Sequence, residues 1–152
     1  MFEHVRNYAQ LLQRIRGWLK PQGKLFVHIF CHRSLAYPYE DRGESDWMTR
    51  TFFTGGMMPS FDLFEYFDQD MKIENRWWFD GVHYERTSNA WLDNMDANRK
   101  ATKAIFDEHY GKDQSDLWVQ RWRMFFMAVA ELFGYDEGRE WGVGHYLFTP
   151  SS

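Results

Sequence analysis

A carboxylate is followed directly by an imidazole at the start of the chain, in Glu3-His4. Such a pair can orient an amine, accept a proton and favour positive charge on a bound group. A Glu-His dipeptide near a chain end is otherwise an ordinary solvated start of a helix. Acid–base chemistry on an amine is therefore one hypothesis for this pair, and it depends on the residues that the fold brings beside it.

Other side chains could complete such a site. His28 lies in an apolar run and could equally be a core histidine, while Tyr84 could equally be a packing residue with a bonded hydroxyl. Trp122 could be a core position of a helix. Because aromatic faces attract cations, three residues are candidates for an apolar or cation-binding pocket: Trp47, Phe53 and Trp122.

A metal site is the rival chemistry. His28 and His32 are four residues apart and flank Cys31. On a strand these two histidines do not converge as they would on a helix. Two histidines and one thiol are also not a recognised zinc spacing, so we expect no metal.

Composition restricts the class of protein. The 152 residues are 44% hydrophobic and 20% aromatic, which is enough for one domain with a core. The net charge of −4 argues against a nucleic-acid partner. We expect basic residues near the start, such as Arg6 and Arg14, to form the solvated face of a helix.

The single cysteine forms no internal disulfide and fits a reducing, cytoplasmic compartment. We expect no signal peptide, and no apolar stretch is long enough to span a membrane.

Hydrophobic periodicity predicts alternating helices and strands with a long connection at 33–60. The run at 24–30 is typical of a buried strand in a parallel sheet. Helices are expected at 7–19, 61–67, 87–107 and 115–133, the last capped by Gly134, and further strands at 71–79 and 141–149. About three strands make a thin α/β sheet, so the pattern indicates a truncated domain.

Several segments occur in the same order as in a known family. They are Met1–Tyr8, Trp18–Pro21 with Gly23, Leu25–His32, Asp46-Trp47, Phe53–Ser60, His83-Tyr84-x-x-Thr87-x-x-x-Trp91, and Trp122-x-x-Phe125-Phe126 with the closing strand. Together they resemble the S-adenosylmethionine-dependent methyltransferases of the cyclopropane-fatty-acid-synthase and coclaurine-N-methyltransferase type. Each motif alone is weak, but the ordered set covers nearly the whole chain.

The resemblance implies an α/β fold, the C-terminal portion of a class I (Rossmann-like) methyltransferase sheet with a helical substrate cap. We expect one partial domain over 1–152, with a helix and strand of the core in 1–32, a loop, a strand and the cap in 33–134, and the final strand in 135–152. The family's first half carries a glycine-rich nucleotide turn that this chain lacks. S-adenosylmethionine is therefore expected only for a full-length enzyme, and no cofactor-binding residue is predicted here.

The resemblance also implies roles for the candidate residues. In the coclaurine-type enzymes the residues matching Glu3 and His4 act on the amine substrate. In cyclopropane synthases the matching Glu, with a His matching His28 and a Tyr matching Tyr84, holds a bicarbonate ion that serves as the base. We therefore predict Glu3 and His4 as catalytic residues, and as substrate-binding residues His28, Trp47, Phe53, Tyr84 and Trp122.

The segment Phe30-Cys31-His32 and the Gly55-Gly56 loop are more similar to the coclaurine-type branch. The favoured function is methyl transfer to a small-molecule amine. Methylene transfer to an unsaturated lipid acyl chain is the alternative, although the sequence shows no basic amphipathic helix for reaching a membrane. A third possibility is an inactive remnant, or a fragment that binds a partner through its exposed sheet edge. The sequence predicts no oligomeric state.

Overall fold

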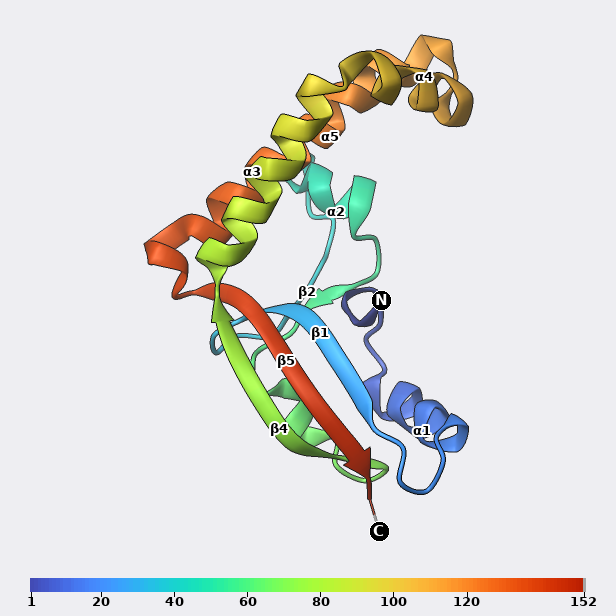
Figure 1. Cartoon of the computed structure of the whole chain (residues 1–152), viewed down its shortest axis with the longest axis vertical. Helices are drawn as coiled ribbons and strands as arrows, with labels where there is room; N and C mark the ends of the chain where they lie inside the picture. The colour runs from blue at the N-terminus through green and yellow to red at the C-terminus, as the bar shows by residue number, and fades with distance from the viewer. Residues whose placement is uncertain (152) are drawn as a thin grey trace.

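The computed structural model describes residues 1–151. An antiparallel sheet forms one end, and a pair of long helices extends away from it (Figure 1). The strands are β1 (Leu25–His32), β4 (Met71–Asp80) and β5 (Trp141–Pro150), in the order β1-β5-β4. The last strand in the sequence is therefore the central strand of the sheet. This arrangement places residues from opposite ends of the chain side by side, and His28 faces His145 in the register.

The prediction that the first strand is buried in a parallel sheet is wrong for the residues described. Within residues 1–151, the ladder of β1 is formed with β5 and is antiparallel, and a single parallel bridge joins its last residue, His32, to Ser60. Side chains alternate between two faces: Val27 and Ile29 are buried, whereas Phe26 is 55% exposed and His28 is also exposed. Alternation of this kind is the signature of a sheet covered on one face, which explains the difference.

Helix α1 (Tyr8–Trp18) confirms the helix expected at 7–19. Its N-cap is Asn7, whose side-chain oxygen accepts a hydrogen bond from the Gln10 backbone N–H. The buried residues Tyr8, Leu12 and Ile15 join the core on the covered face of the sheet. The buried members of this core are Phe2, Tyr8, Leu12, Ile15, Val27, Ile29, Phe64, Met71, Tyr146 and Phe148.

The predicted helix at 87–107 is two helices. Helix α3 (Gly81–Ala97) starts directly after β4, and α4 (Arg99–Tyr110) follows a break at Asn98. The Asn98 backbone departs from helical geometry, with φ of −106° and ψ of 27°, and its side-chain amide donates to the Asn94 carbonyl oxygen over 2.9 Å. Gly111, with φ of 84°, then turns the chain into α5 (Lys112–Gly134). The helix expected at 115–133 is thus confirmed, with Tyr135 rather than Gly134 as its C-cap.

The long connection at 33–60 is folded rather than irregular. It contains a small antiparallel pair, β2 (Tyr37–Pro38) with β3 (Met57–Met58), and a short helix α2 (Trp47–Phe52). Short 3₁₀ turns complete the structure: η1 (Phe2–His4), η2 (Glu44–Asp46), η3 (Leu63–Tyr66) and η4 (Tyr135–Gly138). The helix expected at 61–67 is therefore a 3₁₀ turn. Within residues 1–151, no helix has the length and apolar character that crossing a membrane requires.

Phe64 provides a test of the core. Its ring packs edge-on against the rings of Tyr8 and Tyr146, with centroid distances of 5.0 and 4.9 Å. We predict that Phe64→Ala lowers the free energy of unfolding by about 3–5 kcal/mol, because it leaves a cavity between η3, α1 and β5. Tyr66→Ala is the matched control in the same turn, since Tyr66 is 75% exposed, and should change stability by less than about 0.5 kcal/mol. Urea denaturation measures both, and equal effects would contradict this account of the core.

Candidate active site

Three of the predicted site residues meet at one cavity. Glu3 from η1, His28 from β1 and Tyr84 from α3 line a space of about 200 Å³. Its remaining wall is mostly apolar and consists of Met1, Ile29, Phe30, Trp91 and Val143. The first turn of the chain, the first strand and the start of the helical hairpin therefore jointly enclose a carboxylate, an imidazole and a phenol.

Glu3 is the anionic group of this cavity. Its side chain is 22% exposed, and its Oε2 lies 2.7 Å from the α-amino nitrogen of Met1. Burial opposes ionisation, but hydrogen bonds from the Met1 ammonium and from backbone, together with positive charge nearby, outweigh it and keep the pKa of Glu3 below its ordinary value. This carboxylate is therefore an acceptor for charge-assisted hydrogen bonds in the lining of the cavity.

His4 does not line this cavity, although it lies next to Glu3. Its Nε2 is 3.7 Å from Glu3 Oε1, and its ring stacks on Phe53 with 6.0 Å between centroids. Phe53 in turn packs against Phe30 and Phe125, each at a centroid distance of 5.9 Å. Phe53 thus connects the Glu3-His4 turn to both the sheet and α5.

The glycine loop is locked to the Glu3-His4 turn. A Cβ at Gly56 would collide with the carbonyl oxygen of Glu3, so only glycine allows this approach. Arg6 secures the contact, since its Nε donates to the Gly56 carbonyl over 3.2 Å and its Nη2 donates to the Tyr39 carbonyl over 2.9 Å. The expectation that Arg6 belongs to a solvated helix face is therefore wrong, because it precedes α1 and positions the loop.

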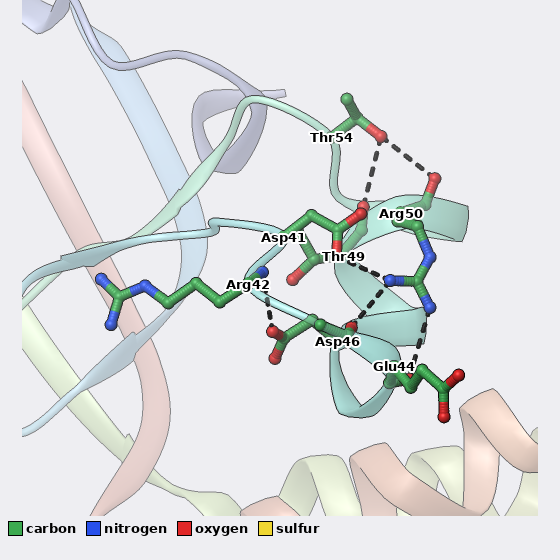
Figure 2. Close-up of polar contacts among 8 residues, drawn as sticks. Asp41, Arg42, Glu44, Asp46, Thr49, Arg50 and Thr54 are labelled. Carbon is green, nitrogen blue, oxygen red and sulfur yellow. Dashed lines mark hydrogen bonds and ion pairs between the residues drawn. The ribbon is translucent and has the colours of Figure 1, made fainter.

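The segment that carries Trp47 and Phe53 is held by its own polar contacts. Arg50 donates to the Asp41 carboxylate over 2.6 Å (Figure 2). It also donates to the Gly43 carbonyl over 2.8 Å. The Thr54 hydroxyl donates to the Thr49 carbonyl oxygen over 3.2 Å and so closes the end of α2. Helix α2 is only six residues long, so these contacts rather than its length fix its position.

Tyr84 belongs to three neighbouring cavities, of about 200, 330 and 150 Å³. Burial raises the pKa of its hydroxyl, and the negative charge of Glu3 adds to this rise. At neutral pH, Tyr84 is therefore a protonated phenol that can donate a hydrogen bond into the cavity beside a carboxylate.

His28 is engaged by a second histidine. The Nδ1 of His28 lies 2.7 Å from Nε2 of His145, which is opposite it on β5. Both rings line the cavity of about 330 Å³, together with His83 and Phe79. Burial and the nearby His28 charge lower the pKa of His145. His28 also lines the cavity of about 200 Å³ that Glu3 lines, the Glu3 cavity. It therefore lies between this cavity and the one of about 330 Å³.

Trp47 and Trp122 lie away from this group. Both pack against Phe52, at centroid distances of 6.0 and 4.9 Å. Trp122 also lines a separate space of about 640 Å³ between α3, α4 and α5. Its buried Nε1 has no hydrogen-bond partner within residues 1–151. The structure therefore brings Glu3, His28 and Tyr84 together, attaches His4 and Phe53 beside them, and leaves these two tryptophans in an outer aromatic cluster.

His28 and His32 have different partners. His32 is buried, and its Nδ1 accepts hydrogen bonds from the backbone N–H groups of Ser34 and Leu35 at 3.0 and 2.9 Å. Its Nε2 faces Glu140 at 3.1 Å. Both ring nitrogens are thus used within the fold, and His32 acts as a structural residue at the end of β1.

Two residues of the site were missed by sequence reasoning. Trp91 lines both the 200 and the 330 Å³ cavities, and a signal for it exists, because Tyr84, Thr87 and Trp91 share one face at helical spacing. His145 gives no such signal. Its place beside His28 follows only from the register of β1 and β5.

This sheet, with its helical hairpin and a carboxylate-containing cavity at their junction, defines part of a class I methyltransferase fold. The family model described as mycolic acid cyclopropane synthetase matches residues 1–137. The chain belongs to this family.

Plant N-methyltransferases are similar to the chain over nearly all of its length. It is 39% identical to the (S)-coclaurine N-methyltransferase of Thalictrum flavum subsp. glaucum, with 97% of this chain and 42% of that protein covered. The (S)-coclaurine N-methyltransferase of Papaver somniferum is also 39% identical, with 97% and 43% covered. The chain therefore spans less than half the length of these relatives.

Solved structures agree on the fold. A crystal structure of coclaurine N-methyltransferase bound to N-methylheliamine and SAH superposes with a TM-score of 0.88 and 36% identity, covering 98% of this chain and 44% of that one. A cyclopropane synthase of Mycobacterium tuberculosis has a TM-score of 0.72 at 19% identity, covering 99% and 52%, and this likeness concerns the fold alone.

The contact between Gly56 and Glu3 can be tested. We predict that Gly56→Ala destabilises the chain by about 1–3 kcal/mol and weakens the stacking of His4 on Phe53, because the new methyl group pushes the loop away from η1. The ring proton shifts of His4 in an NMR spectrum report the stacking. Gly43→Ala is the matched control in the same loop, since nothing lies near its Cβ position. An unchanged His4 spectrum in Gly56→Ala would contradict the proposed lock.

The coupling of Tyr84 to Glu3 predicts a titration result. Because the charge of Glu3 contributes to the raised pKa of Tyr84, Glu3→Gln should lower that pKa towards its ordinary value while burial keeps it above. Titration of carbon-labelled tyrosine by NMR measures it. Glu74→Gln, which removes a carboxylate paired with Lys24, is the control and should leave Tyr84 unchanged. A Tyr84 titration that is insensitive to Glu3→Gln would contradict the placement of these groups in one cavity.

Proposed function

We propose that the chain supplies the acceptor side of an S-adenosylmethionine-dependent N-methyltransferase whose substrate is a small-molecule amine. The observation that carries this proposal is the cavity whose lining combines the Glu3 carboxylate with His28, Tyr84 and aromatic side chains. The identity to plant N-methyltransferases supports it. We also place the activity in the cytoplasm, in keeping with the single cysteine of the chain.

The roles of the residues follow from their chemistry. Glu3 binds the amine, because a charge-assisted hydrogen bond to a carboxylate fixes both position and orientation. His4 acts on the amine through Glu3, which it approaches to 3.7 Å. The aromatic faces of Phe30 and Trp91 border the cavity and favour a cationic nitrogen. We propose Phe53, Trp47 and Trp122 as the residues that contact the remainder of a larger substrate.

Residues 1–151 do not form a cofactor-binding turn. The step from β4 to α3 passes through Gly81, but a Cβ there would meet the carbonyl oxygens of Phe133 and Trp141, so the space is already filled by backbone. Gly55-Gly56 and Gly142 do not connect a strand to a helix. Bound S-adenosylmethionine supplies an electrophilic methyl group, and we assign its binding to a part of the enzyme outside this chain.

A chimaera tests the proposal. The chain is joined to the preceding part of the Thalictrum flavum coclaurine N-methyltransferase, in place of the portion that it matches. We expect this protein to methylate a cyclic secondary amine, 1,2,3,4-tetrahydroisoquinoline, and Glu3→Gln to lower kcat/KM by about 100-fold or more because the amine loses its anionic partner. Mass spectrometry of the product measures the rate.

Glu137→Gln is the control, since this carboxylate is 82% exposed and lies in η4. It should leave methylation unchanged. If the folded chimaera binds S-adenosylmethionine and transfers no methyl group to any amine, or if Glu3→Gln is as active as the parent, the proposal is wrong.

A second candidate function has one observation in its favour. Glu3, His28 and Tyr84, which the family resemblance assigns to a bicarbonate site, do line one cavity. The same chimaera, supplied with an unsaturated phospholipid and bicarbonate, decides between the two. A cyclopropane product that requires bicarbonate, without N-methylation, would replace the amine by a lipid acyl chain as the substrate.

A further inference from the structure

His28, which lines the Glu3 cavity, and His145 lie closer together through their ring nitrogens than packing alone requires. At 2.7 Å, the separation of His28 Nδ1 and His145 Nε2 is that of a short hydrogen bond, with one hydrogen between two basic nitrogens. Both rings cannot be imidazolium ions at this distance, because each would present a positively charged N–H group to the other. The pair can therefore carry one positive charge at most.

The two ring nitrogens of His28 consequently have different roles. Nδ1 is committed to His145, which leaves Nε2 as the nitrogen available to the Glu3 cavity that His28 lines. A histidine whose second nitrogen is held by a fixed partner is the arrangement of a general base with an orienting group. The aromatic rings of Phe26 and Phe79 flank His145, at centroid distances of 5.1 and 4.4 Å, and hold it in place.

Resting on the proposed function, we propose that His28 accepts the proton that the amine must lose, and that His145 is the positioning residue that holds His28 in the required tautomer. An alkylamine is an ammonium ion at neutral pH and has no free electron pair. In the proposed step one ammonium N–H bond breaks, the proton forms a bond to His28 Nε2, and the electron pair stays on the amine nitrogen. His28 becomes an imidazolium ion whose Nδ1–H donates to neutral His145.

The groups around His28 and His145 are compatible with a proton moving from the amine to His28. The other titratable groups that line the two cavities are Glu3, Tyr84, His83 and His145. Burial and the charge of His28 both lower the pKa of His145, so the neutral acceptor is the state that His145 prefers. The 330 Å³ cavity gives His28 a second open side through which the proton can leave.

The tautomer can be measured in the chain itself. Long-range proton–nitrogen NMR spectra of the imidazole rings distinguish a protonated from an unprotonated nitrogen. At a pH where His28 is neutral, we expect His28 to carry its hydrogen on Nδ1 and none on Nε2, and we expect His145→Phe to alter this distribution. A His28 ring that carries its hydrogen on Nε2, or that is unaffected by His145→Phe, overturns the proposal whatever the chimaera does.

The active chimaera tests the catalytic part through the pH profile of kcat/KM. His28→Gln should lower kcat/KM by about 100-fold and remove the acid limb that reports the protonation of His28. His145→Phe, which keeps a ring between its aromatic neighbours, should lower kcat/KM about 10- to 100-fold and move the acid limb to lower pH, because the imidazolium ion loses its hydrogen-bond acceptor. His145→Gln keeps an acceptor without a titrating group and should recover most of the activity.

The two proposals fail in different ways. His109→Gln, an exposed histidine on α4, is the control and should leave the profile unchanged. If Glu3→Gln abolishes methylation while His145→Phe keeps both the rate and the acid limb of the parent, the amine site stands and the histidine pair is only structural. If no variant or parent transfers a methyl group, the proposed function fails, and the tautomer spectra still decide whether His145 orients His28.

Discussion

The insertion of β5, the last strand of the chain, between β1 and β4 is the constraint on which the rest of the structure depends. β5 forms antiparallel ladders with β1 on one side and β4 on the other. The ladder with β4 ends beside Gly142, so β4 passes directly into α3 at a point where Gly81 touches the backbone of Phe133 and Trp141. This contact sets where the helical hairpin starts, and thereby where Tyr84 and Trp91 face the sheet.

The candidate site is assembled by the same pairing. Its carboxylate comes from the first turn of the chain, His28 from the first strand and its phenol from α3, while His145 of the last strand lies beside His28. Close backbone approach at Gly56 and the two hydrogen bonds of Arg6 then attach the 39–56 loop to Glu3 and His4. Polar groups are thus placed by backbone geometry, while aromatic packing around Phe53 and Phe52 joins this region to α5.

Much of this could be predicted from sequence, and the misses have physical reasons. Periodicity located α1, α5 and the three strands because each has a clear apolar face or run. It could not show that 87–107 breaks at Asn98, since the pattern stays helical and only the backbone of this one residue, with φ of −106° and ψ of 27°, departs from helical geometry. Ordered motifs identified the family and the residues Glu3, His28 and Tyr84. His145 and Arg6 escaped because strand register and a loop contact decide their roles, and neither has a local signal.

A crystal structure of the chimaera with SAH and 1,2,3,4-tetrahydroisoquinoline shows where the amine binds. If this chain holds the amine, the amine nitrogen lies about 2.7–2.9 Å from the Glu3 carboxylate, and His28 and Tyr84 border the same cavity. An amine bound elsewhere, for example only in the outer space beside Trp122 with Glu3 turned away from it, would mean that Glu3 does not hold the amine.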